Sequence, residues 1–418
     1  MTRTNPKVVH LPAAAIQRAA RQFPTPFFVY DEKKIRANCR RLNQAFGRRF
    51  PGFTPLFAVK ANTNPEILRI IFSEGFGADA SSEAEAWITR KLGGWGMYTG
   101  NYTTEQEFRF VKTMGLLLNL DDISMLPTIK KIGVPEFLSF RVNPGIGKGG
   151  MKSLLLAGPD AKFGVPPADV VEAYRRAMAL GVRRFGMHAM TGSNVLGERY
   201  FAEITMKILE IAGQVKRKLG IDFEFLNIGG GFGVPYRSEE KSLDLDEVAR
   251  GVRRAFDVQC ARYGLEEPRL MVEPGRLITA DAGWLVARVN VIKESYKKFV
   301  GVDAGTNDLP RPAFYDAYHH LTVLGRSARG HKEKVNVVGR LCENNDQFAK
   351  DRPLPRIEVG DIIAIHNAGA HAFAMGHNYN NRPRSAEYLI TSKGALKKIR
   401  RAETIADLFK TTYLAATL

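Results

Sequence analysis

Cysteine is scarce in this chain of 418 residues, which contains only Cys39, Cys260 and Cys342, widely spaced. An odd number of distant cysteines provides no disulfide framework and is typical of a reducing compartment, so we expect a cytoplasmic protein. No apolar run approaches the roughly 18–20 residues that a membrane-spanning helix requires. The N-terminal segment also lacks the continuous apolar region of a secretory signal. We therefore expect neither a membrane protein nor a secreted one.

Acidic residues are in the minority, with 43 Asp and Glu against 61 Lys and Arg and a formal net charge of +18. Basic residues cluster at 33–49, 325–334 and 393–402. Nucleic-acid binding would need them joined into a stripe with interleaved aromatic residues, or placed within a known module, and the sequence contains no such module. We expect a basic solvated surface and no nucleic-acid partner. Positive potential would also attract an anionic substrate or a phosphorylated cofactor.

The length and the 44% hydrophobic content are typical of a globular protein of two domains. Short β-like runs alternate with amphipathic, helix-like stretches from about residue 55 to 275. The predicted strands are 55–60, 77–81, 96–100, 116–120, 137–142, 184–190, 223–228 and 269–274. Such alternation predicts an α/β fold, a (β/α)8 TIM-type barrel, with a doubly wound open sheet as the alternative.

After Gly283 the sequence becomes rich in β-like runs and poor in long helices. Alternating side chains and turn residues there predict an antiparallel sandwich or barrel domain. The early strand TPFFVYD (25–31) precedes the barrel pattern, and we expect it to pair with this second domain. The predicted domains are a barrel at 33–283 and a C-terminal β-rich domain formed by 1–32 and 284–418. We find no internal repeat and no low-complexity segment.

Lys60 is the most informative residue, because it places an amine at the end of the apolar run PLFAVKAN (55–62). A buried charge is costly unless it is neutralised or used. A Schiff base to a carbonyl cofactor would do both, because an amine in an apolar pocket is easily deprotonated and nucleophilic. The alternative is a lysine whose stem is buried and whose amine reaches solvent.

Other polar residues also lie at predicted strand ends, which a βα barrel gathers at one rim. Glu273 would pair with a protonated pyridine nitrogen, or else form a buried ion pair with Arg276 or another arginine. Asp79 would orient the Lys60 region, or cap local structure. The glycines of GGGFG (229–233) would let backbone N–H groups approach a phosphate, or simply form a tight turn. The remaining rim candidates are Asn143, His188, Ser193 and Gly275.

With these residues the chain resembles the fold type III pyridoxal-phosphate decarboxylases, and among them the diaminopimelate decarboxylases. The resemblance extends from about residue 25 to 389. It rests on FAVKAN (57–62), GADASSEAE (77–85), KFGV (162–165), NIGGGFG (227–233), EPGR (273–276), DAGTNDLPRPAFYDAYH (303–319), CENNDQFA (342–349) and GAHAFAMGHNYNNRPRSAE (369–387). It implies a barrel with a β-rich domain, pyridoxal 5'-phosphate as cofactor, no metal, and active sites shared across a homodimer.

The resemblance also implies roles for individual residues. Lys60 would bond the cofactor aldehyde, and Cys342 of the partner subunit would donate a proton, so these two are the predicted catalytic residues. Substrate would be bound by Arg276, Arg311, Tyr315 and Glu343. The remaining residues predicted to contact the cofactor are Asp79, His188, Ser193, Gly230, Gly231, Glu273, Gly275, Arg276 and His371.

The sequence departs from the family pattern in three places. Met190 stands where many relatives have a histidine that stacks on the cofactor ring, with His188 two residues earlier. Met190 would then cover the ring with its polarizable thioether. His371 replaces the usual tyrosine of a GAY motif, and Asn344 and Asn345 alter the segment that follows Cys342.

The implied reaction is decarboxylation of meso-2,6-diaminopimelate to L-lysine and carbon dioxide, a step of lysine biosynthesis. Two arginines near the site suit a substrate with two carboxylates. The alternatives are decarboxylation of ornithine, arginine or carboxynorspermidine, an amino-acid racemase of the same fold type, a non-catalytic cofactor-binding protein, and, more remotely, RNA association.

Overall fold

The computed structural model describes residues 11–149, 156–327 and 330–413. The expectation that the chain lacks a secretory signal concerns its N-terminal segment. The first ten residues of that segment lie outside the described residues. The chain divides into two compact units. The barrel unit comprises Arg36–Val234 and Ser242–Leu277, and the sheet unit comprises the described residues up to Ile35, Pro235–Lys241, and those from Ile278 onward.

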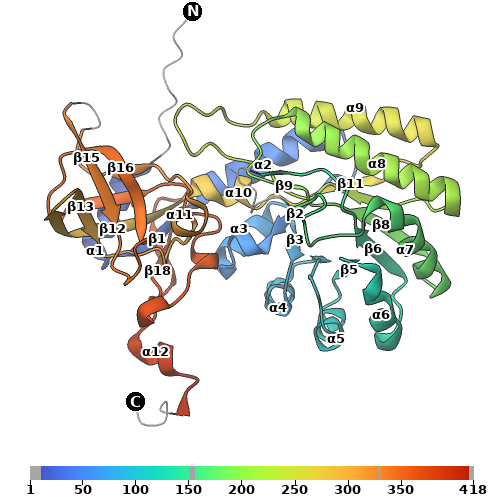
Figure 1. The fold of residues 1–418 in the computed structure, drawn as a ribbon, viewed down its shortest axis with the longest axis horizontal. Helices are drawn as coiled ribbons and strands as arrows, with labels where there is room; N and C mark the ends of the chain where they lie inside the picture. The colour runs from blue at the N-terminus through green and yellow to red at the C-terminus, as the bar shows by residue number, and fades with distance from the viewer. Residues whose placement is uncertain (1–10, 150–155, 328–329, 414–418) are drawn as a thin grey trace, which may run out of the picture. The chain divides into compact units, whose positions relative to one another are not determined.

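The barrel unit contains a closed barrel of eight strands, all paired in parallel (Figure 1). The strands are β2 (Thr54–Ala58), β3 (Gly77–Ala80), β4 (Gly96–Tyr98), β5 (Leu117–Leu120), β6 (Phe137–Arg141), β8 (Arg184–His188), β10 (Phe225–Asn227) and β11 (Arg269–Val272). The predicted TIM-type barrel is therefore confirmed. Closure between β11 and β2 rules out the doubly wound open sheet.

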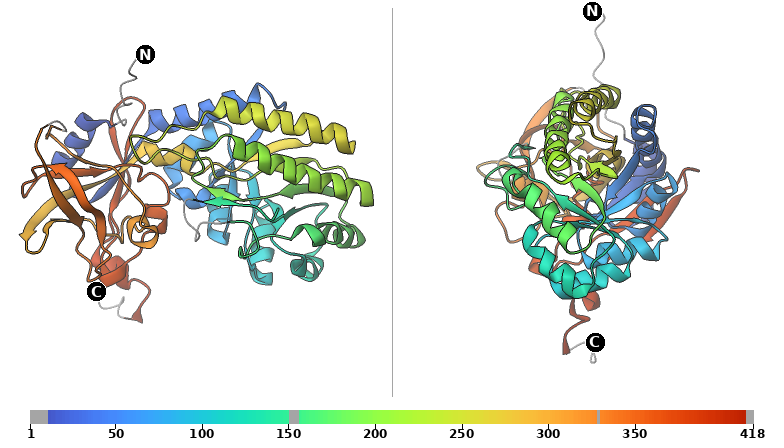
Figure 2. Two further views of the ribbon diagram at one scale, coloured as in Figure 1. Left: turned by 45° about the horizontal axis from the view of Figure 1, so that its top comes forward. Right: turned by 90° about the vertical axis from the view of Figure 1, so that its right-hand side faces the viewer.

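Helices alternate with these strands along the chain and surround them in the end-on view of Figure 2. They are α2 (Glu32–Gly47), α3 (Pro65–Ser73), α4 (Glu83–Lys91), α5 (Glu105–Thr113), α6 (Leu126–Ile132), α7 (Pro167–Ala179), α8 (Arg199–Leu219), α9 (Leu245–Tyr263) and α10 (Arg276–Thr279). Local sequence explains several of their ends. Asn64, Ser82 and Thr104 accept backbone N–H groups at the starts of α3, α4 and α5, as capping side chains do. Gly220 and Gly264 end α8 and α9 in the left-handed conformation.

A layer of apolar side chains from different strands packs together in the barrel. Leu56, Met97, Phe225 and Met271 form this buried cluster. Since all eight strands run in parallel, their carboxyl ends meet at one rim. Side chains just beyond the apolar layer, at strand ends far apart in sequence, can therefore reach one another.

The sheet unit is built on a nine-stranded mixed sheet. Its strands are β1 (Phe27–Asp31), β12 (Gly283–Glu294), β13 (Lys298–Val302), β14 (Leu321–Val323), β15 (Lys332–Val338), β16 (Gln347–Pro355), β17 (Ile362–Ile365), β18 (Ala386–Ile390) and β19 (Leu396–Arg400). As predicted, the early strand β1 belongs here, between β12 and β18. Most pairings are antiparallel, but β1–β18 and β13–β15 are parallel. Parallel pairing requires long connections, and both pairs have them.

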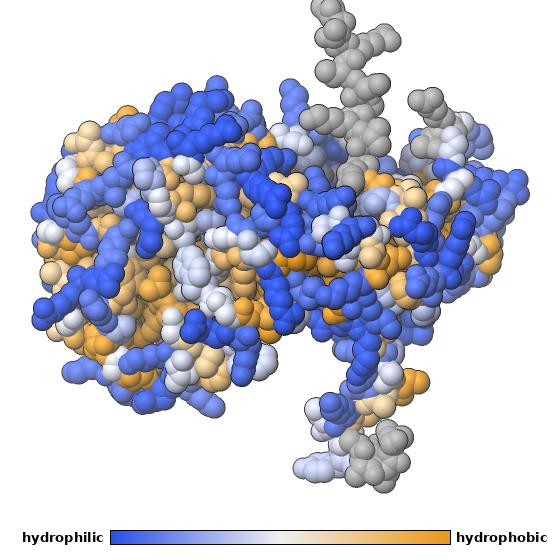
Figure 3. Space-filling view, turned by 180° about the vertical axis from the view of Figure 1, so that it is seen from behind, coloured by the Kyte–Doolittle hydropathy of each residue, from blue (hydrophilic) through white to orange (hydrophobic). Residues whose placement is uncertain are grey.

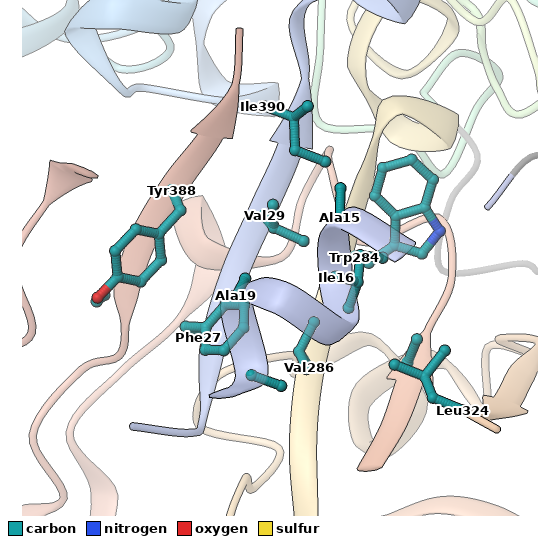
Figure 4. Packing of buried hydrophobic residues seen from close by; sticks show 13 residues of the cluster. Ala15, Ile16, Ala19, Phe27, Val29, Trp284, Val286, Leu324, Tyr388 and Ile390 are labelled. Atoms are coloured by element: carbon teal, nitrogen blue, oxygen red, sulfur yellow. The ribbon is translucent and has the colours of Figure 1, made fainter. Parts of the chain in front are cut away.

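The core of the sheet unit forms where α1 (Ala13–Gln22) packs on this sheet. Ile16 and Ala19 of α1 lie against Phe27 of β1, Trp284 of β12 and Tyr388 of β18 (Figure 4). Trp284, Phe27 and Ile16 are at most 1% exposed. Their burial fixes β12 in the sheet, where it pairs with β1 and β17.

Within the described part of the chain, no helix combines the length and apolar character that crossing a bilayer requires. On the face shown in Figure 3, hydrophilic and apolar side chains are interspersed.

Candidate active site at the barrel mouth

The predicted strand 55–60 includes Lys60, but in the structure this residue lies in the turn that follows β2. β2 ends at Ala58, and Lys60 is the central residue of a short 3-10 turn, Val59–Ala61. Its Nζ lies 3.3 Å from Oδ2 of Asp79 and 3.3 Å from Oγ of Ser81. The Lys60 side chain is 45% exposed, whereas that of Asp79 is 2% exposed. The turn thus carries the amine out of the apolar layer to the barrel mouth.

The charge on this amine differs from the sequence-based expectation. Partial removal from water opposes the ammonium form, but the carboxylates of Asp79 and Glu273 outweigh it and raise the pKa of Lys60. Burial and the Glu273 carboxylate raise the pKa of Asp79, against the opposing effect of Lys60. The expected apolar pocket would have favoured the neutral amine of Lys60. In the structure, the carboxylates of Asp79 and Glu273 favour its ammonium form instead. Asp79 is in turn the neighbouring group best placed to accept a proton.

Glu273 follows β11 and is buried, at 4% exposed. Nε2 of His188 lies 3.1 Å from its carboxylate, and Nδ2 of Asn227 donates to its Oε1 at 2.7 Å. Burial alone would raise the pKa of Glu273, but the charge and hydrogen bond of His188 outweigh it, and the pKa is lowered. Glu273 is thus ionised and fixed from two sides. An ionised carboxylate is what a protonated pyridine nitrogen requires.

The glycine triplet after β10 combines a tight turn with close packing. Gly229 and Gly231 have positive φ of 72° and 88°, where other residues are strained. A Cβ on Gly230 would lie 2.4 Å from the carbonyl oxygen of Glu273, and one on Gly275 would lie 2.8 Å from Cβ of Ala61. The glycines therefore form a tight turn that packs closely against Glu273 and Ala61, and their approach to a phosphate stays a prediction.

The segment after β8 is hydrogen-bonded to this glycine loop. The N–H of Val195 donates to the carbonyl of Gly231 at 2.8 Å, which places Ser193 in the same loop cluster. The N–H of Gly230 lies 3.1 Å from Sδ of Met190. The thioether that replaces the usual histidine is therefore in contact with the phosphate-binding candidate Gly230.

Sequence reasoning missed three polar residues in this cluster. Asn227 ends β10 two residues before Gly229, so its position was a usable signal. Glu85 accepts the N–H of Ser81 at 2.7 Å, and burial raises its pKa to about 7. Arg141, at the end of β6, lies 3.7 Å from Asp121, and burial lowers its pKa. Glu85 lies three residues after the helix-capping Ser82, so this spacing was a local signal. Nothing local marks Arg141, because its partner Asp121 lies on another part of the chain.

The Asn143 side chain contacts a neighbouring loop. Its side-chain oxygen accepts the N–H of Gly158 at 2.8 Å, and its amide donates to the carbonyl of the same residue at 3.0 Å. Asn143 thus ties two loop segments together. Arg276, the first residue of α10, is 8% exposed.

The remaining candidates belong to the sheet unit. Arg311 and Tyr315 begin and end α11 (Arg311–Tyr315), and Arg311 is 6% exposed. Cys342 and Glu343 are exposed in the loop between β15 and β16, where the N–H of Cys342 donates to Oδ1 of Asn380 at 2.6 Å. His371 follows β17 with a positive φ of 54°. Each is therefore carried by a loop or short helix that connects strands of the sheet unit.

The barrel-mouth residues fit a pyridoxal-type cofactor. Lys60 offers an amine for an aldehyde, ionised Glu273 suits a pyridinium nitrogen, and the glycines with Ser193 offer donors for a phosphate. Oδ1 of Asp79 and Nδ1 of His188 are buried polar atoms without a protein partner among the described residues. A ligand bound in the barrel mouth would supply hydrogen-bond partners for these two atoms.

Comparisons with known proteins agree with this chemistry. A family model described as pyridoxal-dependent decarboxylase, pyridoxal binding domain, matches residues 32–280. A protein named diaminopimelate decarboxylase from Methanothermobacter thermautotrophicus is 43% identical over 397 residues, covering 94% of this chain and 92% of that protein. A protein named TabA from Pseudomonas amygdali pv. tabaci is 40% identical and covers 92% of this chain and 90% of its own length.

A solved structure extends the similarity to three dimensions. The crystal structure of diaminopimelate decarboxylase from M. jannaschii in co-complex with L-lysine has a TM-score of 0.88 at 32% identity. It covers 97% of this chain and 95% of that chain.

Proposed function

The chain belongs to the family of pyridoxal-dependent decarboxylases, and we propose that within this family it converts meso-2,6-diaminopimelate to L-lysine and carbon dioxide. Its cofactor is pyridoxal 5'-phosphate. The substrate assignment rests on one observation: relatives named diaminopimelate decarboxylase match nearly the whole chain, the Methanothermobacter protein over 94% of it. The barrel mouth supports the cofactor part of the proposal independently, through the Lys60–Asp79 and Glu273–His188 contacts.

Bound pyridoxal phosphate supplies an aldehyde that takes the substrate amine and an electron-poor ring that accepts the electron pair left when carbon dioxide departs. Lys60 would hold the aldehyde carbon and exchange with the substrate amine. Because Lys60 is held as an ammonium, it must lose a proton before it reacts, and Asp79, 3.3 Å away, would accept it. Glu273 would keep the ring nitrogen protonated. The phosphate would be held by Ser193, Gly230, Gly231, Gly275, Arg276 and His371.

The substrate residues come from the sheet unit and Arg276. Arg311, Arg276 and Tyr315 would bind a substrate carboxylate. Tight binding of the carboxylate that leaves as carbon dioxide would stabilise the ground state and slow the reaction. The arginines should therefore bind the other carboxylate, which remains in the product lysine. Cys342 would give its thiol proton to the α-carbon as carbon dioxide leaves, so one proton replaces one carboxyl group. Glu343 would meet the distal amino group.

We also propose a homodimer in which Cys342 and Glu343 serve the partner's site, with no nucleic-acid partner. Cys342 and Glu343 are exposed, which supports such a role. The proposed cofactor domain runs from 33 to 283, close to the family match at 32–280. A cytoplasmic location is proposed from the spacing of the three cysteines, all of which are free thiols.

Decarboxylation of another basic amino acid or of carboxynorspermidine is the second candidate. It is favoured by Asn344 and Asn345, which depart from the family pattern beside Glu343, where the far end of the substrate would bind. The 40% identical protein TabA, whose name specifies no substrate, leaves room for it as well.

The test measures carbon dioxide release by the purified holoenzyme. Meso-diaminopimelate, lysine, ornithine, arginine and carboxynorspermidine are each supplied, with Lys60→Ala as the inactive control. We expect release from meso-diaminopimelate alone, with one L-lysine formed per carbon dioxide. Release from another compound instead would replace the substrate assignment, and inversion of an amino acid without release would replace it with racemisation.

A further inference from the structure

Arg311, the proposed carboxylate-binding residue, is held by a buried histidine that no part of the proposed mechanism uses. Nη1 of Arg311 lies 2.9 Å from Nε2 of His319, which is 0% exposed. Nδ1 of His319 lies 2.7 Å from the backbone carbonyl of His366. The Arg311 guanidinium also lies over the Tyr236 ring, 4.7 Å from its centroid. These contacts all lie within the sheet unit.

The partners of His319 determine where its proton lies. A carbonyl oxygen only accepts, so Nδ1 must carry a hydrogen and donate to His366. A guanidinium only donates, so Nε2 must be unprotonated and accept from Arg311. His319 therefore makes both contacts only as the neutral tautomer with the proton on Nδ1.

The histidine is itself anchored to strands rather than to a free loop. The backbone N–H of His366 donates to the carbonyl of His320 at 2.9 Å, which ties the end of β17 to the start of β14. Arg352 of β16 donates from Nη1 to the carbonyl of His319 at 3.0 Å. His319 is thus fixed by three strands and can transmit that fixed position to Arg311.

We propose that His319 is a positioning residue for Arg311, aligning its guanidinium for the carboxylate that the substrate retains. The chemistry of the acceptor matters here. An aspartate or glutamate in the place of His319 would form an ion pair and compete with the substrate, whereas a neutral imidazole orients the guanidinium and leaves its positive charge intact. The inference rests on the proposed function, because Arg311 must bind substrate for its alignment to count.

Two substitutions distinguish the role of Nε2 of His319, which accepts from Arg311, from that of Nδ1, which donates to the carbonyl of His366. In His319→Asn the amide can replace the Nδ1–H that donates to His366 but does not reach Arg311. In His319→Gln the longer side chain can place its oxygen where Nε2 accepts from Arg311. His320→Asn makes the same change one residue away, at a side chain outside the proposed site.

The experiment measures KM and kcat with meso-diaminopimelate, and the Kd of L-lysine for the holoenzyme by calorimetry. Losing a hydrogen bond to a charged group should raise KM and Kd in His319→Asn by about 10-fold or more, with kcat little changed. His319→Gln should recover most of the loss, and His320→Asn should match wild type. Melting temperatures are recorded for all variants.

Unchanged KM and Kd in His319→Asn would overturn the inference. Equal increases of KM and Kd in His319→Asn and His319→Gln would also overturn it. So would a fall of kcat together with the melting temperature. Either result would indicate that His319 contributes to packing and does not align Arg311. The wild-type arm reports separately on the proposed function. If wild type decarboxylates a different carboxylate substrate, the same comparison is made with that compound.

Discussion

The buried side chain of His366 makes the stability of the sheet unit depend on pH. Nε1 of Trp284 donates to Nδ1 of His366 at 3.3 Å, and Nε2 lies 2.9 Å from Oγ1 of Thr322. Indole N–H can only donate, so Nδ1 must be unprotonated. Burial, helped by nearby His320, lowers the pKa of His366 from 6.5 to about 3. The native protein therefore holds this imidazole neutral.

The size of the effect follows from the two pKa values. Below pH 6.5 the unfolded chain takes up a proton at His366 that the native state refuses, so stability falls as pH falls from about 6.5 to about 3. At pH 5 the loss is about 2 kcal/mol relative to pH 8. The group is 1% exposed, so solvent screening of this figure is small.

His366→Gln isolates this contribution. Glutamine can still donate to Thr322 but does not titrate, and it leaves the Trp284 N–H without its acceptor at a cost of about 1–3 kcal/mol. At pH 8 the variant should be less stable than wild type by that amount. At pH 5 the gap should shrink by about 2 kcal/mol, because only wild type pays for keeping the imidazole neutral.

Urea unfolding followed by Trp284 fluorescence measures this gap. The chain has three tryptophans, and Trp87 and Trp95 are 45% and 44% exposed, so both can be replaced by phenylalanine to leave Trp284 as the only reporter. Wild type and variant are compared in that background at both pH values. Parallel stability curves between pH 8 and pH 5 would refute the reasoning, since His366 would then titrate alike in both states.

Four further predictions concern the barrel mouth and the Cys342 loop. Lys60→Ala should give no mass-spectrometric cofactor adduct after borohydride reduction, whereas wild type should carry one on this lysine. Gly230→Ala brings a Cβ to 2.4 Å from a backbone oxygen, so the Kd of pyridoxal phosphate for the apoenzyme, from a fluorescence titration, should rise by about 10-fold or more. Glu85→Gln removes a carboxyl with a pKa of about 7 whose ionised form supports the Lys60 ammonium. The kcat/KM profile should therefore lose an inflection near pH 7, and an unaltered profile would contradict this role. Cys342→Ala should reduce turnover about 100-fold without changing the cofactor absorbance, while Cys260→Ala should resemble wild type.

Much of the barrel could be predicted from local sequence. The apolar runs and the helical stretches between them indicated eight βα units, and the structure confirms eight parallel strands. The exact strand ends were less accessible, because Lys60 lies in a turn that begins where β2 stops. The sheet unit was harder to predict, since its parallel pairs join strands separated by long stretches of chain.

The sequence alone indicated that Lys60, Asp79, the glycine triplet and Glu273 share one rim, because strand ends in a parallel barrel meet at one edge. The resemblance of its motifs to the fold type III pyridoxal-phosphate decarboxylases also indicated the cofactor class. Only the tertiary structure decided which groups bond. His188 and Glu273 meet across 85 residues, and His319 meets Arg311 and the carbonyl of His366 in one buried cluster. The tertiary structure also decided that the pKa of Lys60 is raised, because a pKa depends on burial and on distances to charges, which no local pattern encodes.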